Sequence, residues 1–200
     1  MKRITTILLC LLCTITMMAE GHMKFRTLSI DGDLKTAIKQ VKKWGLMGMK
    51  IKNVAAMMGT LDGEDVILAL IATPETNTLF SVSIVYEGSD QWSEQLAKYQ
   101  DINAKLAAQY GEPTKVIDQW EAPYSIDNNP IQAFQEEKAV YSSTYTTSEG
   151  YVSINLMYTD GKICTAVAYV DEQNSALYIA EGGREVTFEE YETEEMTIEE

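Results

Sequence analysis

Two series of short apolar segments, each broken by turn residues, constrain the fold of this chain more than any other feature. The first series covers residues 54–60, 66–73 and 79–86, with Asp62-Gly63 after its first segment. The second covers residues 139–147, 151–158 and 163–170, with turns at Glu149-Gly150 and Asp160-Gly161. An Asp-Gly pair between alternating apolar segments is a strong hairpin signal. The sequence therefore predicts two antiparallel β-meanders.

Apolar residues at helical spacing predict helices beside these strands. One helix covers residues 34–44, with Asp33 as its N-terminal cap and Gly45 at its end. A longer helix is expected after a cap at Ser89 or Asp90, and it ends before Gly111. Further elements are predicted as strands at residues 24–30 and 114–121, a short helix after Pro130 and a last helix at about 171–181.

This order of elements predicts an α+β fold, with antiparallel meander sheets and helices packed on one face. Residues 24–111 and 114–183 each read as strand, helix, three strands and helix. The tripeptide Ser-Ile-Asp precedes a helix start in both halves, at residues 29–31 and 125–127. We therefore consider a divergent tandem repeat, with chance similarity of short α+β patterns as the alternative.

The first residues have the composition of a secretory signal peptide. Lys2 and Arg3 precede an uncharged apolar run at residues 4–18 and the small residue Ala19. This run is shorter than the roughly 20 residues that a membrane-spanning helix needs, although a retained anchor is the alternative. We predict a signal peptide at residues 1–19, an α+β domain at 20–183 and an acidic, mobile tail at 184–200. The protein is then expected in the periplasm or outside the cell.

Charge and cysteine content narrow the function classes. The formal net charge is −14, and no basic patch with interleaved aromatic residues is apparent. Such a chain repels nucleic acid and anionic membranes, so we expect no nucleic-acid binding and no membrane insertion after signal cleavage. The charge instead predicts a protein partner with a basic surface. After cleavage Cys164 is the only cysteine, and its apolar surroundings predict a buried structural thiol.

No pattern in the sequence predicts a catalytic site. The chain has one histidine, His22, which at the mature N-terminus is poorly placed to act as a base. It lacks a zinc motif, a phosphate-binding glycine loop and a nucleophile elbow. Two acidic turn clusters do not have the spacing of an EF-hand: Asp31 with Asp33, and Asp62 with Glu64 and Asp65. We therefore predict no catalytic, cofactor-binding or metal-binding residue, no cofactor and no enzyme activity.

Tyrosines on the second meander allow a binding interpretation. They alternate with small polar residues and would form a tyrosine-rich sheet face suited to protein or glycan contacts. The alternative is that the rings pack beneath the helices. The four residues are Tyr141, Tyr145, Tyr151 and Tyr158.

Several segments together carry a family resemblance. They are the signal peptide, Gly21-His22-Met23-Lys24-Phe25, Ser29-Ile30-Asp31-Gly32-Asp33, the Trp92 to Pro113 helix and its stop, and Val167-Ala168-Tyr169-Val170-Asp171. In these the chain resembles small exported proteins of unknown function from Bacteroides-type gut bacteria. The resemblance implies an exported α+β protein of a Gram-negative envelope, and it transfers no catalytic or binding residue.

Export, acidity and the missing catalytic motifs together favour one function class. We predict a non-catalytic binding or interaction module of the bacterial envelope. Two alternatives stay open from the sequence, namely a carboxylate-dependent hydrolase and a carrier of a small ligand or metal.

Overall fold

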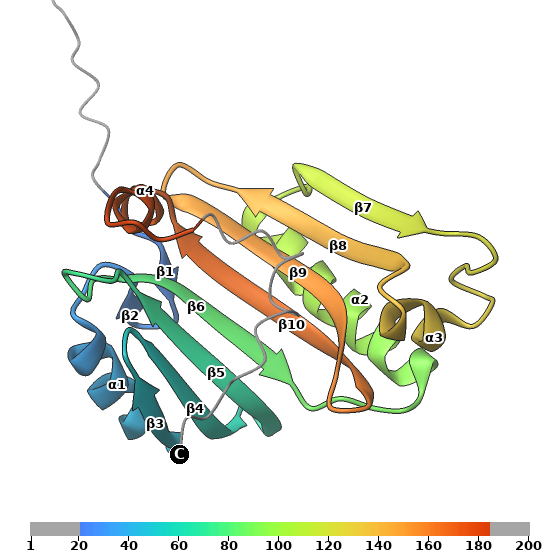
Figure 1. The fold of residues 1–200 in the computed structure, drawn as a ribbon, viewed down its shortest axis with the longest axis horizontal. Coiled ribbons are helices and arrows are strands. Elements are labelled where there is room, and N and C mark those ends of the chain that lie inside the picture. The colour runs from blue at the N-terminus through green and yellow to red at the C-terminus, as the bar shows by residue number, and fades with distance from the viewer. Residues whose placement is uncertain (1–20, 185–200) are drawn as a thin grey trace, which may run out of the picture.

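The computed structural model describes residues 21–184, which form an α+β domain (Figure 1). Its centre is an antiparallel sheet of eight strands in the order β3-β4-β5-β6-β10-β9-β8-β7. This confirms the predicted fold class. The predicted signal peptide at residues 1–19 and the predicted tail after Arg184 lie outside the described residues.

The first meander has one strand more than the sequence predicted. The predicted turn is confirmed, because Asp62 and Gly63 both have positive φ, 54° and 86°. Its strands are β3 (Met47–Ile51), β4 (Val54–Leu61), β5 (Glu64–Ala72) and β6 (Leu79–Tyr86).

Strand β3 escaped prediction because its side chains show no alternation of burial. All five residues of this edge strand are exposed. Gly48 lies opposite Met57 in the β3–β4 register. A Cβ atom at this glycine would collide with the carbonyl oxygen of Ala56, so the close approach of the two strands requires glycine here.

The second meander joins the first through its last strand. Its strands are β7 (Lys115–Trp120), β8 (Ala139–Thr146), β9 (Gly150–Thr159) and β10 (Lys162–Asp171), with helix α3 (Pro130–Gln135) between β7 and β8. Strand β10 pairs with β6 in antiparallel register, with Val167 opposite Ile84. Both meanders therefore belong to one sheet.

Two helices pack on the same face of this sheet. Helix α1 (Leu34–Lys43) begins at Asp33, whose carboxylate accepts a hydrogen bond from Lys35 N at 2.9 Å, as predicted. The N-cap residue of helix α2 (Trp92–Tyr110) is Gln91, so the predicted cap at Ser89 or Asp90 was wrong. Ser89 Oγ instead accepts a hydrogen bond from Gln91 N at 3.0 Å, before the helix starts.

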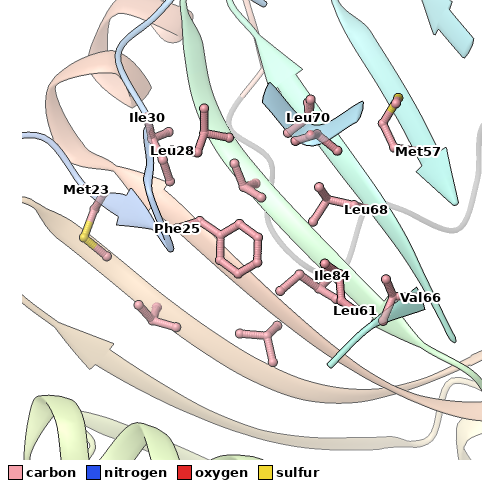
Figure 2. Packing of buried hydrophobic residues seen from close by; sticks show 14 of the residues in the cluster. Met23, Phe25, Leu28, Ile30, Met57, Leu61, Val66, Leu68, Leu70 and Ile84 are labelled. Atoms are coloured by element: carbon pink, nitrogen blue, oxygen red, sulfur yellow. The ribbon is translucent and has the colours of Figure 1, made fainter. Parts of the chain in front are cut away.

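The N-terminal segment forms a small hairpin rather than the single strand predicted at residues 24–30. Strands β1 (Lys24–Phe25) and β2 (Leu28–Ser29) pair with each other, and Arg26 takes a positive φ of 56° in the turn between them. The hairpin is short, but its apolar side chains complete the core. Figure 2 shows Phe25 and Leu28 in the same cluster as Leu68 and Ile84 of the sheet.

The order of helices and strands gives each meander a preceding helix, α1 before β3–β6 and α2 before β7–β10. Helix α2 packs on β8, β9 and β10, although it falls within the first predicted half, residues 24–111. The origin of the two halves in a tandem repeat stays a prediction.

A buried carboxylate ties the N-terminal segment to the end of the central strand. Asp171 is fully buried, and its Oδ2 accepts hydrogen bonds from Met23 N at 2.8 Å and from His22 Nδ1 at 3.0 Å. Its Oδ1 caps helix α4 (Glu172–Ala180) by accepting from Asn174 N at 2.9 Å. His22 is thus held in place by a structural contact, whereas the sequence suggested an unfixed side chain at the mature N-terminus.

We expect Asp171→Asn to destabilise the domain by about 1–3 kcal/mol. The amide can accept at only one position, which leaves a buried N–H without a partner. Urea unfolding followed by circular dichroism measures the change. Asp31→Asn, at an exposed position, is the control and should stay within about 0.5 kcal/mol of the wild type. Equal stability of the two variants would show that the Asp171 contacts contribute little.

Candidate functional site

The candidate site is the face of the sheet opposite α1 and α2, here called the open face. In Figure 1 helix α2 runs behind strands β8–β10, with the sheet between it and the viewer. Side chains alternate between the two faces of a strand. The helix face carries the core, including Leu68, Val82 and Ile154, so the residues next to them along each strand belong to the open face.

One end of the open face carries an apolar patch. Met47, Met58 and Ile67 lie side by side across β3, β4 and β5, and Met47 is 75% exposed. Scattered exposed apolar side chains are normal, whereas contiguous groups on adjacent strands are typical of interaction surfaces. The patch consists of Met47, Met49, Ile51, Val54, Met58 and Ile67, all of which are exposed.

The charges near the apolar patch differ in sign from the net charge of the chain. Residues 34–61 contain six lysines and no Asp or Glu, whereas residues 62–184 contain 19 acidic and six basic residues. Lys50 lies on β3 and Lys52 in the turn that follows, and both are exposed. The edge of the sheet beside the patch is therefore basic, a local feature that the net charge conceals.

The other end of the open face holds a cavity of about 490 Å³ with a mixed polar and apolar lining. The strand register places Lys115, Thr144 and Ser153 in one row across β7, β8 and β9, and it places Ile117, Ser142 and Asn155 in the next row. The remaining lining residues are Phe134, Glu137, Ala139, Val140, Leu156, Met157 and Tyr158.

Two side-chain atoms at this cavity are buried without a hydrogen-bond partner, Ser153 Oγ and Asn155 Oδ1. A buried polar atom left unpaired costs about 1–3 kcal/mol. On the helix face comparable groups are paired, since Ser143 Oγ lies 2.9 Å from the Tyr99 hydroxyl and Thr165 Oγ1 lies 3.0 Å from Gln95 Oε1. The unpaired atoms therefore distinguish the cavity from the core.

A second cavity, of about 340 Å³, lies on the helix face between α2, the N-terminal hairpin and the β4–β5 turn. Its acidic side chains pair with cations: Asp62 with Arg26, Glu64 with Lys98 at 2.7 Å, and Asp101 with Lys105 at 2.7 Å. Burial raises the pKa of the Tyr86 and Tyr169 hydroxyls in the same cavity. A hydrolase would need two convergent acids with separated pKa values, and the ion pairs here give no support to that alternative.

The acidic turn residues singled out in the sequence serve local structure. Asp33 caps α1, Asp62 pairs with Arg26, and Asp65 Oδ1 accepts a hydrogen bond from the Thr60 hydroxyl at 2.7 Å. Across residues 21–184, no group of three or more His, Cys, Asp or Glu side chains is placed to hold a metal ion. Within that same range, no helix is both long and apolar enough to cross a membrane.

Cys164 and two of the four tyrosines also have structural roles. Cys164 is buried, and this burial raises the pKa of its thiol. The Tyr145 hydroxyl donates a hydrogen bond to Asn103 Oδ1 of α2 at 2.8 Å, and the Tyr141 ring packs edge-on against Tyr99 at 5.0 Å. Tyr141 and Tyr145 thus lie beneath α2, which confirms the alternative that these rings pack under the helices and rules them out as part of a binding face.

Comparisons with protein-family models, with curated proteins and with solved structures gave no match for this chain. The resemblance to exported Bacteroides-type proteins therefore rests on the sequence features alone. Function is therefore inferred from the chemistry and geometry of the site.

We expect the domain to lose stability between pH 10 and about 12, in part through Tyr99. Burial raises the pKa of Tyr99 to about 12, whereas an unfolded tyrosine titrates near 10. The neutral phenol thus favours the folded state, and its contribution is complete below pH 10 and lost as the pH rises through 12. Between pH 10 and about 12, the urea concentration at the midpoint of unfolding should fall less steeply with pH for Tyr99→Phe than for the wild type. Equal slopes would show that Tyr99 does not contribute to alkaline unfolding.

Proposed function

We propose that this protein is an exported, non-catalytic binding module of the bacterial envelope and that it binds a protein partner through the open face of its sheet. The apolar patch on β3–β5 is the observation that supports the proposal most directly. Export is supported by the signal-like residues 1–19, and the envelope by the family resemblance.

The composition of the apolar patch fits protein binding. Three of its six side chains are methionines, which are unbranched and adapt to the shape of a partner. Met49 and Met58 are 64% and 57% exposed, so their burial in a complex would remove a large apolar surface from water. None of these side chains takes part in the core on the helix face. The fold does not need apolar side chains at these positions.

Charge indicates the chemistry of the partner at this surface. Lys50 and Lys52 make the β3 edge basic, so the partner is expected to contact the patch through apolar and acidic side chains. The net charge of the chain predicted a partner with a basic surface. A basic surface on the partner would instead face the acidic remainder of the domain. Attraction between these two surfaces would mainly raise the rate at which the partner associates with the domain.

We expect the triple variant Met47→Gln, Met49→Gln, Met58→Gln to lose its partner while it stays folded. Because the three side chains are exposed, unfolding free energy should change by less than about 0.5 kcal/mol per substitution. Wild-type and variant proteins are used as baits in an envelope extract from the source bacterium. The recovered protein is then purified, and its affinity is measured by calorimetry.

The control is Val116→Gln, which removes an apolar side chain that is 62% exposed but lies on β7, outside the patch. We expect at least about tenfold weaker binding for the triple variant and wild-type affinity for the control. Equal recovery by all three baits contradicts a role for the patch. Self-association of the wild type that the triple variant abolishes would make the occupant a second copy instead.

A further inference from the structure

We propose that the cavity on β7–β9 is a separate binding site for an uncharged saccharide unit. The cavity is lined by residues of β7–β9 and the apolar patch lies on β3–β5. These strands form opposite ends of the sheet, with β6 and β10 between them (Figure 1). The site is therefore independent of the protein-binding surface proposed above.

The unpaired atoms point to a ligand. Ser153 is only 3% exposed, and its hydroxyl has no hydrogen-bond partner. Asn155 lies beside it on the same face of β9, and its carbonyl oxygen is buried and equally unpaired. Natural proteins rarely leave buried polar atoms unsatisfied. Two such atoms at one cavity favour a bound molecule that supplies the missing hydrogen bonds.

The lining of the cavity defines the chemical class of that molecule. The hydroxyls of Ser142, Thr144 and Ser153 can each donate and accept hydrogen bonds. The side-chain amide of Asn155 can donate through its NH₂ group and accept through its carbonyl oxygen. Lys115 and Glu137 contribute one charge of each sign, so the cavity does not select an ion. A ligand with many hydroxyl groups matches such a set of donors and acceptors.

The apolar part of the lining supports a saccharide over a smaller polyol. Sugar rings carry C–H groups on their faces as well as hydroxyls at their edges, and these C–H groups pack against apolar side chains. Here Phe134, Val140, Met157 and Tyr158 line the cavity together with the polar groups. The volume of about 490 Å³ also lies within the range of about 300–1,000 Å³ that is usual for small-molecule sites.

Calorimetry of the full chain with three neutral probes tests this site. The probes are methyl glucoside, methyl galactoside and methyl N-acetylglucosaminide. We expect saturable binding of at least one of them with a Kd of about 1 mM or tighter. Ser153→Ala and Asn155→Leu should each weaken that binding at least about tenfold. Neither should lower the thermal stability of the free protein, because each removes an unpaired polar atom.

The matched control is Ser83→Ala, a serine on the same face of the sheet, in line with Ala168 of β10 and outside the cavity lining. It should keep the affinity within about twofold of wild type. Failure of all three sugars to bind at about 10 mM overturns the proposal, as does binding that the two cavity variants leave unchanged. Binding of triglycine in place of any sugar would also overturn it. The triple methionine variant of the apolar patch tests protein binding independently of this cavity, so failure of one proposal can be told apart from failure of the other.

Discussion

The pairing of β6 with β10 is the contact on which the rest of this structure depends. These are the last strands of the two meanders, and they join residues far apart in the sequence, such as Ile84 and Val167. Both side chains belong to the core on the helix face. Because the two meanders share this centre, their helices cover one continuous core, and strands β3 and β7 form the two edges of one sheet.

Asp171 is the last residue of the central strand β10 and fixes the point at which this strand passes into helix α4. A carboxylate in a fully buried position is costly unless its oxygens accept several hydrogen bonds. Here they accept from the N-terminal segment and from the first turn of α4. Asn174 extends the contact, since its side-chain amide donates to Ile30 O at 2.8 Å. The end of the sheet, the N-terminal hairpin and the last helix are thereby held by one polar cluster.

Local signals predicted the elements well where a strand or helix buries one side. Strand β6 was predicted with its observed bounds, and the Asp-Gly turns were found because their residues tolerate positive φ. Strand β3 was missed because it buries neither side. The hairpin at Lys24–Ser29 was missed because two-residue strands leave no periodicity to detect. The β6–β10 pairing has no local signal at all.

The candidate site was harder to predict than the fold, since it depends on register. In the sequence Ser142 and Asn155 are ordinary strand residues, and only the β8–β9 pairing places them side by side. The lysine-rich segment at residues 34–61 was readable in the sequence, but the net charge of the whole chain obscured it. The tyrosines left two interpretations open, because alternation with polar residues does not say which face a helix covers.

The open face is informative because its two ends depart from what a stable sheet requires. A solvent-facing side of an antiparallel sheet is ordinarily polar and hydrated. At β3–β5 it is instead apolar and exposed, which lowers solubility. At β7–β9 it buries Ser153 Oγ and Asn155 Oδ1 without partners, which lowers stability. Neither feature contributes to the core. Under the binding functions proposed here, bound molecules would offset both costs, and this is the physical reason for assigning binding to this face.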